Sequence, residues 1–207
     1  MQTAAENKRV LEDTLIIATH NEGKVREMQD LLGGKVTTIQ SAGELGLDDP
    51  EETGTTFHAN AALKAVAAAE ATGKIALADD SGLAVEALNG DPGIYSARWA
   101  EDENGHRDWD YGMQKIWDQI KDQDNMRATF ITVLALAWPD GHVEYIEGNV
   151  HGTIVWPKRG ENGFGYDPIF QPDGEDRTFG EMTQDEKQGM SHRAKALKEF
   201  IATWCAS

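Results

Sequence analysis

Residues 75–82 read Ile75-Ala-Leu-Ala-Asp79-Asp80-Ser81-Gly82. The four small apolar residues predict a short buried strand, which runs directly into two carboxylates, a hydroxyl and a glycine. Because side chains alternate along a strand, Asp79 and Asp80 are expected on opposite faces, with at most one of them in a site on a given side. Adjacent acids are also common in ordinary turns, and on spacing alone a turn is the simpler interpretation.

Around this stretch the hydrophobic pattern alternates between strands and helices. Strands are predicted at residues 14–18, 35–39, 75–78, 130–138, 142–146 and 153–156, and helices after residue 24, at 57–71, at 108–121 and after Ser191. The apolar stripe of 108–121 is interpreted as core or subunit contact rather than a cofactor site. This order predicts an α/β fold with a large mixed sheet, in two lobes with a cleft between them.

Length and composition are typical of one globular domain. The 207 residues are 40% apolar and include no run long enough to span a bilayer. Residues 1–13 are polar, lack the apolar centre of a secretory signal and are expected to be a flexible extension, with a single domain at 14–207. The single cysteine, Cys205, suits a reducing cytoplasm.

The net charge of −17 restricts the possible partners. It argues against a nucleic-acid polymer or an acidic membrane surface. It is compatible with a small anionic ligand, because a divalent cation and a few local Lys or Arg side chains can make the electrostatic potential of one cleft positive. A polyphosphate substrate would make a metal almost required.

The segment Thr19-His20-Asn21-Glu22-Gly23-Lys24 lies between a predicted strand and a predicted helix. Free backbone N–H groups and the helix dipole favour an anion at such a place. Lys24 in the first turn opposes that dipole unless an anion lies in front of it. The glycine spacing of a P-loop is absent, and a plain strand-to-helix connection fits equally well.

Two further segments are suited to ligand binding. Phe57, Asn60 and Lys64 share one helix face, which is either an exposed edge or a cleft wall with Glu52 just ahead of it. The glycine-rich residues 160–168 carry two aromatic side chains that suit stacking on a planar heterocycle, although a tight turn with packing aromatics is equally compatible.

Taken together, these segments resemble the inosine/xanthosine triphosphate pyrophosphatases of the Ham1/RdgB type, in the order found in that family and from residue 15 to residue 204. The shared motifs are Thr19-x-Asn21-x-x-Lys24, Glu51-Glu52-Thr53-Gly54-x-Thr56-Phe57-x-x-Asn60-Ala61-x-x-Lys64-Ala65, Ala78-Asp79-Asp80-Ser81-Gly82-Leu83, Pro92-Gly93-Ile94-Tyr95-Ser96-Ala97-Arg98, Gly163-Phe164-Gly165-Tyr166-Asp167-Pro168-Ile169-Phe170 and Ser191-His192-Arg193. Each motif alone is weak, and the full set is highly specific.

The resemblance implies an elongated two-lobed α/β fold with a central mixed sheet flanked by helices, usually in a homodimer. It also implies hydrolysis of the non-canonical purine nucleoside triphosphates ITP, dITP and XTP to the monophosphate and pyrophosphate. A water would attack at the linkage between the α- and β-phosphates, with Mg²⁺ as cofactor.

The same resemblance assigns roles residue by residue. Glu52 and Asp80 would hold Mg²⁺, and Asp80 would also be the proton acceptor. Substrate binding would involve Thr19, His20, Asn21, Glu22, Gly23, Lys24, Lys64 and Ser81 around the phosphates and Phe164, Gly165, Tyr166, Asp167, Lys187, His192 and Arg193 around the base and sugar.

Physical chemistry qualifies these roles. A carboxylate beside a metal has a low proton affinity, so orientation of water and metal is a more plausible task for Asp80 than full proton abstraction. Arg193 or a backbone N–H is expected to donate to the C6 oxygen of the base. His20 departs from the family pattern, where a smaller residue is common. The alternatives are a Maf-type nucleotide pyrophosphatase and a nucleotide-binding regulator that does not hydrolyse its ligand.

Overall fold

The computed structural model of this chain describes residues 9–205. Its strands are β1 (Thr14–Ile17), β2 (Thr38–Ser41), β3 (Ile75–Val85), β4 (Arg127–Ala137), β5 (Val143–Ile154) and β6 (Phe170–Pro172). Its α-helices are α1 (Glu22–Leu32), α2 (Phe57–Thr72), α3 (Ser96–Trp99), α4 (Trp109–Ile120), α5 (Gln184–Met190) and α6 (His192–Phe200).

The strands form one six-stranded mixed sheet in the order β2-β1-β3-β4-β5-β6. Strand β1 pairs in parallel with β2 and β3, whereas the β3–β4, β4–β5 and β5–β6 pairs are antiparallel. Strands β3, β4 and β5 have 11 or 12 residues, whereas β1 and β2 have four. The three long strands therefore continue well beyond the end of β1.

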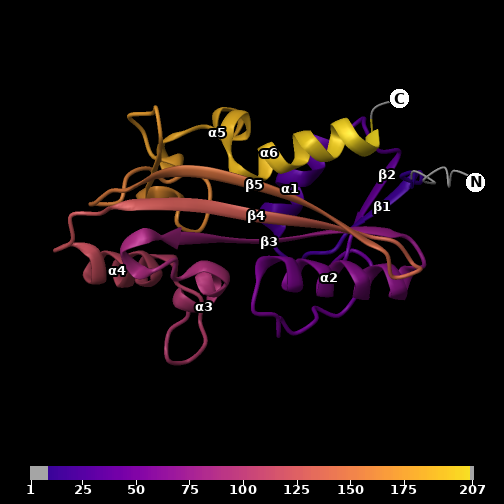
Figure 1. The fold of residues 1–207 in the computed structure, drawn as a ribbon, viewed down its shortest axis with the longest axis horizontal. Helices are drawn as coiled ribbons and strands as arrows, with labels where there is room; N and C mark the ends of the chain where they lie inside the picture. Colours follow the sequence, from indigo (N-terminus) through magenta and orange to yellow (C-terminus); the bar gives the residue numbers. More distant parts are fainter. Residues whose placement is uncertain (1–8, 206–207) are drawn as a thin grey trace, which may run out of the picture.

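Helices cover both faces of this sheet (Figure 1). Helix α2 packs on one face through small residues such as Ala61 and Ala65, and α1 and α6 lie on the other. The far half of the long strands has its own core, in which Ile116 of α4 packs with Phe130 and Phe170. Apolar burial of this kind is the main stabilising contribution to each half. The α/β architecture with two packed halves is confirmed.

Strand β3 differs from the expected strand followed by an acidic turn. It runs without interruption through Asp79 and Asp80, because every residue from 76 to 85 pairs with β4. Gly82 permits this course, since a Cβ there would lie 2.1 Å from the carbonyl oxygen of Gly93. The turn interpretation was wrong because long-range pairing overrides the local turn preference of Asp and Gly.

The strand boundaries differ elsewhere too. The strands predicted at 142–146 and 153–156 belong to one continuous strand, β5, which ends at Ile154 and pairs with β4 from Val143 to Thr153. The second strand begins at Thr38 rather than at residue 35. The helix expected at 108–121 is confirmed, and Met113, Ile116 and Ile120 of its stripe are buried.

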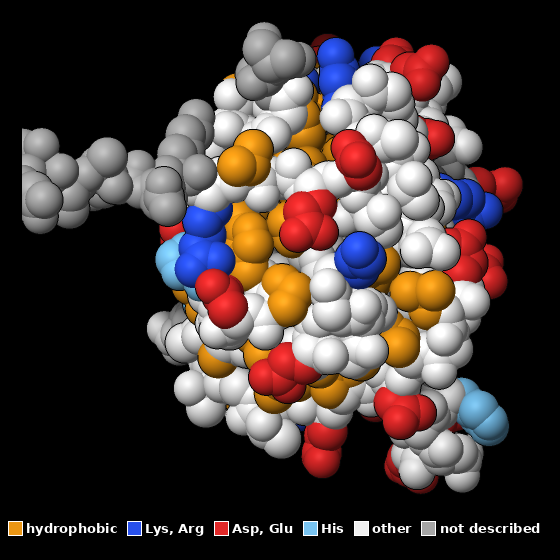
Figure 2. All heavy atoms as spheres, turned by 90° about the vertical axis from the view of Figure 1, so that its right-hand side faces the viewer, with side chains coloured by type: hydrophobic (Ala, Val, Ile, Leu, Met, Phe, Trp, Pro, Cys, Tyr) orange, Lys and Arg blue, Asp and Glu red, His pale blue; other side chains and the backbone are white. Residues whose placement is uncertain are grey.

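The ends of the chain and the outer surface carry little further information on function. Of the predicted extension at 1–13, residues 1–8 lie outside the described residues, whereas Arg9 donates two hydrogen bonds to Asp140 at 3.1 and 2.8 Å. No helix among residues 9–205 is long and apolar enough to cross a membrane. Figure 2 shows acidic side chains spread over the end of the molecule near both termini, between scattered hydrophobic ones.

Candidate active site

A cavity of about 350 Å³ opens where β1 ends. Strand β1 pairs with β3 only as far as Leu77, so of the described strands only β4 pairs with residues 79–82. The edge of β3 that β1 leaves uncovered borders the cavity, so side chains from both faces of β3, such as Asp80 and Ser81, line it. Its lining consists of Thr19, His20, Asn21, Lys24, Asp49, Glu52, Lys64, Asp80, Ser81, Gly82, Leu83, Ile94, Ser96, Ala97, Arg107, Trp109, Phe130, Phe164, Gly165, Tyr166, Asp167, Lys187, His192 and Arg193.

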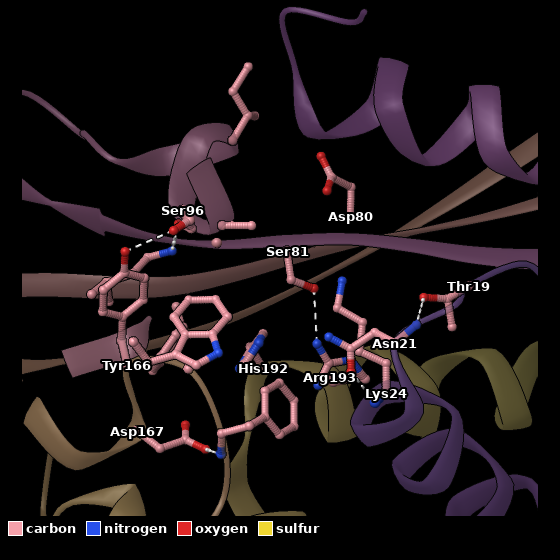
Figure 3. A pocket seen from close by; sticks show the side chains of 18 of the residues that line it. Thr19, Asn21, Lys24, Asp80, Ser81, Ser96, Tyr166, Asp167, His192 and Arg193 are labelled. Atoms are coloured by element: carbon pink, nitrogen blue, oxygen red, sulfur yellow. Dashed lines mark hydrogen bonds between the residues drawn. The ribbon is translucent and has the colours of Figure 1, made fainter. Parts of the chain in front are cut away.

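Asp80 lies on the α2 side of β3 (Figure 3). The Asn60 side chain donates a hydrogen bond to its carboxylate at 3.2 Å, and Lys64 Nζ lies 3.7 Å from Oδ1. Lys64 also donates to Glu52 at 2.5 Å. Burial raises the pKa of Asp80 to about 6 although Lys64 and Lys24 oppose the shift. The protein alone therefore raises the proton affinity of Asp80, and the low proton affinity expected from the sequence would require a bound metal.

Glu52 and Asp80 form a plausible metal-binding pair. Both carboxylates contact the same ammonium group, so they face a common point. Among residues 9–205 no group of three or more His, Cys, Asp or Glu side chains is arranged to hold a metal. Two carboxylates whose remaining ligands come from phosphate and water are the pattern that Mg²⁺ prefers. These residues thus fit a metal that arrives with a phosphorylated substrate.

Asp79 points to the opposite face and is fully buried. Its carboxylate lies 3.1 Å from Lys24 Nζ and accepts hydrogen bonds from Arg193 at 3.2 Å and from Ser81 at 2.5 Å. Burial opposes its ionisation, yet Lys24 and Arg193 hold the pKa of Asp79 far below its ordinary value. Asp79 is thus a permanent anion that positions Lys24 and Ser81, while Asp80 faces the cavity.

Another buried carboxylate, Glu27, joins the Lys24 and Asp79 side of the cavity to the aromatic side. It accepts hydrogen bonds from Arg193 and, at 3.2 Å, from Lys187, which also donates to Asp167 at 2.7 Å. Three elements are linked in this way, because Glu27 lies on α1, Lys187 on α5 and Arg193 on α6. The sequence motifs did not include Glu27, since its partners are 160 and 166 residues away.

The turn before α1 differs in detail from the expected anion site. Asn21 is the N-cap of α1, and its side-chain oxygen accepts from the N–H groups of Gly23 and Lys24 at 3.0 and 3.1 Å. Two of the N–H groups expected to be free are therefore occupied. Glu22 and Gly23 do not line the cavity. His20 contacts the carbonyl oxygen of Leu47 at 2.8 Å.

The other end of the cavity is aromatic. The rings of His192 and Phe130 are stacked with centroids 4.9 Å apart, and Trp109 meets Tyr166 edge-on at 5.3 Å. Lys187 Nζ lies 4.4 Å from the centroid of Phe164. Burial lowers the pKa of His192 well below its usual value, and His192 Nδ1 has no hydrogen-bond partner among the described residues. His192 therefore carries a neutral imidazole at the wall of the cavity.

Arg193 is buried and forms more contacts within the protein than the sequence indicated. Only 2% of the residue is exposed, and its guanidinium donates to Glu27, Asp79 and Ser81. Most of its N–H groups are thus used within the protein. Direct donation from Arg193 to a base stays a prediction, and positioning of Asp79 and Ser81 is the contribution that the contacts display.

Several lining residues were missed as site residues. Trp109 was assigned to core or subunit contact although it is the first residue of α4 and lines the cavity. Asn60, which donates to Asp80, was noted on its helix face but given no role. Phe130 was considered only as part of a strand. An apolar residue in a strand carries no local signal that distinguishes a cavity wall from a core.

The fold and the cavity define a class of protein: an α/β protein with a cleft that has lysines and carboxylates at one end and aromatic rings at the other, as a nucleotide requires. A model of the Ham1 family matches residues 15–203. The dITP/XTP pyrophosphatase of Agrobacterium fabrum is 53% identical over 203 residues, covering 92% of this chain and 95% of the relative.

Solved structures agree with this match. A HAM1 protein from Coxiella burnetii is 38% identical, with a TM-score of 0.83 over 91% of this chain and 96% of that chain. The Ham1 protein of Staphylococcus aureus is also 38% identical, with a TM-score of 0.80 over the same shares. The chain belongs to the Ham1 family.

Proposed function

We propose that this protein hydrolyses the non-canonical purine nucleoside triphosphates dITP, ITP and XTP to the monophosphate and pyrophosphate. The observation that carries the proposal is that β3 places different side chains on its two faces, and that both groups line the same cavity. Asp80 with Lys64 lies on one side of the strand, and Ser81 with Lys24 lies on the other, next to the aromatic end (Figure 3). A triphosphate and a planar base fit these two ends. The printed activity of the relatives supports the same reaction.

The phosphate end acts mainly through charge and orientation. Lys24 and Lys64 neutralise phosphate oxygens, and Ser81, which donates to Asp79, helps to hold the buried charges beside them. Water attacks at the linkage between the α- and β-phosphates, and the bond to the leaving pyrophosphate breaks. Asp80 orients this water as the proposed proton acceptor, and because Mg²⁺ bound to Asp80 lowers its proton affinity, orientation is the larger part of its role.

Mg²⁺ is the proposed cofactor, held by Glu52 and Asp80. When bound, it neutralises negative charge on the phosphates and lowers the proton affinity of its carboxylate ligands. The net charge of −17 makes such a cation valuable, since the cavity would otherwise present Glu52, Asp80 and Asp49 to a polyanion. Lys64 remains to hold the two carboxylates near each other.

The aromatic end selects the base. Phe164 and Tyr166 provide ring surfaces, and His192 provides a neutral imidazole ring. Hypoxanthine and xanthine carry an oxygen at C6 where adenine carries an amino group, so a donor placed there favours the former and opposes the latter. Lys187, His192 or Arg193 supplies that donor.

A homodimer in the cytoplasm completes the proposal. The family resemblance supports the dimer. The single cysteine, Cys205, which is free, supports a reducing compartment such as the cytoplasm. Size-exclusion chromatography with light scattering measures the mass of the purified chain and decides between one and two copies.

The products test the reaction directly. dITP is incubated with the protein and Mg²⁺, and the nucleotides and phosphates are separated by ion exchange. We expect dIMP and pyrophosphate in equal amounts. Formation of dIDP and inorganic phosphate would place the cleavage at the β–γ linkage and contradict the proposal, and binding without any product would favour a nucleotide-binding regulator.

A further inference from the structure

The loop between α3 and α4 brings one basic side chain to the cavity. This loop hangs below α3 in Figure 1 and is closed at its base by a hydrogen bond from the Asp108 N–H to the Ala100 carbonyl, at 2.6 Å. An isolated β-bridge between Glu101 and Arg107 braces it further. Arg107 therefore has a defined place at the root of the loop, where its side chain lines the cavity.

The other Lys and Arg side chains of the cavity are themselves buried, and each is paired with a carboxylate. Lys24 and Arg193 contact Asp79 at 3.1 and 3.2 Å. Lys64 contacts Glu52 at 2.5 Å, and Lys187 contacts Asp167 at 2.7 Å. Each of these four cations is at most 15% exposed. Removing any of them from its partner would leave a buried charge without compensation, which is strongly unfavourable.

Arg107 differs from these four cations in the exposure of its own side chain. Its side chain is 48% exposed, and its partner among the described residues is Glu101, at 2.8 Å and 33% exposed. Exposed ion pairs of this kind contribute little to stability. The guanidinium can therefore exchange Glu101 for another anion at small cost, and its planar donors match the oxygens of a phosphate group in pairs.

We propose that Arg107 is a substrate-binding residue that leaves Glu101 and binds the triphosphate of the substrate, and that Glu101 competes with the substrate for it. The inference rests on the proposed function, because it takes a nucleoside triphosphate as the ligand. Neither residue belongs to the motifs identified in the sequence. The pair tunes affinity for the polyphosphate without altering the buried charges that hold the site together.

The test compares Arg107→Gln, Glu101→Gln and the double variant. Isothermal titration calorimetry at constant Mg²⁺ measures the Kd of inorganic tripolyphosphate, a probe that has no base and needs no turnover. We expect Arg107→Gln to weaken binding about tenfold or more, since a charge-assisted contact is lost. Glu101→Gln should tighten binding about two- to fourfold, because the competing carboxylate is gone. The double variant should match Arg107→Gln.

Arg127→Gln is the matched control. Arg127 forms an exposed ion pair with Asp173 at 2.6 Å and does not line the cavity. It changes the net charge by the same amount, so it should leave the Kd within about twofold of wild type.

Each of the following results would overturn the proposal. One is an unchanged tripolyphosphate affinity in Arg107→Gln, the second is weaker binding in Glu101→Gln, and the third is no binding by the wild type. A changed preference between dITP and dATP with unchanged tripolyphosphate affinity would place Arg107 at the base and also contradict it. Failure of the proposed function is seen separately, as wild-type protein that binds tripolyphosphate but releases no pyrophosphate from dITP.

Discussion

Asp79 and Asp80 are neighbours on β3 with opposite environments. Asp79 is fully buried beside Lys24 and Arg193, whereas Asp80 faces the cavity on the α2 side with Asn60 and Lys64. The pKa of the first is held far below its ordinary value, and burial raises the pKa of the second to about 6. One carboxylate is therefore structural and the other is placed for chemistry.

Substitution of the two acids should separate these roles. Asp80→Asn keeps the size of the side chain and relieves a buried charge, so we expect an unchanged or slightly higher melting temperature and a loss of kcat of about 10²-fold or more. Calorimetry and steady-state kinetics measure the two effects. A kcat close to wild type would remove Asp80 from the mechanism.

Asp79→Asn should affect the fold instead. It leaves Lys24 and Arg193 buried without their shared anion, and breaking such a group typically costs about 3–5 kcal/mol. Urea unfolding at neutral pH measures the free energy of unfolding. A stability equal to wild type would show that the buried cations do not need Asp79.

Glu27 makes stability depend on acid pH. Burial opposes its ionisation, but Arg193 and Lys187 hold the pKa of Glu27 below the ordinary 4.5. The charged form thus stabilises the fold above pH 4.5, and this contribution is lost as pH falls through the lowered pKa. Glu27→Gln should be less stable than wild type at pH 7, with a difference that shrinks below pH 4.5. A difference independent of pH would contradict this account of Glu27.

Gly82 should tolerate no side chain. A Cβ would lie 2.1 Å from the Gly93 carbonyl oxygen and 2.7 Å from Ser96 Oγ, which accepts a hydrogen bond from the Leu83 N–H. We expect Gly82→Ala to lose at least about 1–3 kcal/mol of stability and to lower activity, because β3 must shift. Gly43→Ala is the control, since a Cβ there meets nothing within 4 Å. Equal melting temperatures for the two variants would refute the close contact.

His192 should contribute to base selection through its nitrogens. His192→Phe retains a ring to stack on Phe130 but removes both imidazole nitrogens. We expect the ratio of kcat/KM for dITP over dATP to fall about tenfold, since one hydrogen bond to the base is lost. An unchanged ratio would place base recognition on other residues.

The sequence predicted those parts of the fold that are specified by local pattern. The helix at α4 was found because its apolar stripe has helical spacing, and the α/β class followed from the order of elements. The continuity of β3 through Asp79 and Gly82, and of β5 through Gly148 and Gly152, was missed because pairing with β4 decides it. No local preference contains that information.

The candidate site was predicted to a similar extent. The resemblance assigned most of the cavity lining, whereas contacts over long sequence separations were not foreseen. The ion pair of Glu27 with Arg193, which are 166 residues apart, arises from tertiary geometry. The pair of Arg107 with Glu101, six residues apart, depends on how the loop between α3 and α4 folds. Charge alternation along the chain does not show which acid meets which base, and that pairing decides which cations are fixed and which are free to move.

The central claim is selective cleavage of non-canonical purine triphosphates in this cavity. The most direct measurement is the rate of pyrophosphate release from dITP, ITP, XTP, GTP, ATP and dTTP, each with and without Mg²⁺. The account predicts fast release from dITP, ITP and XTP, slow release from GTP, ATP and dTTP, and little release from any of them without Mg²⁺. Release from GTP or ATP as fast as from ITP, or a preference for dTTP, would contradict it.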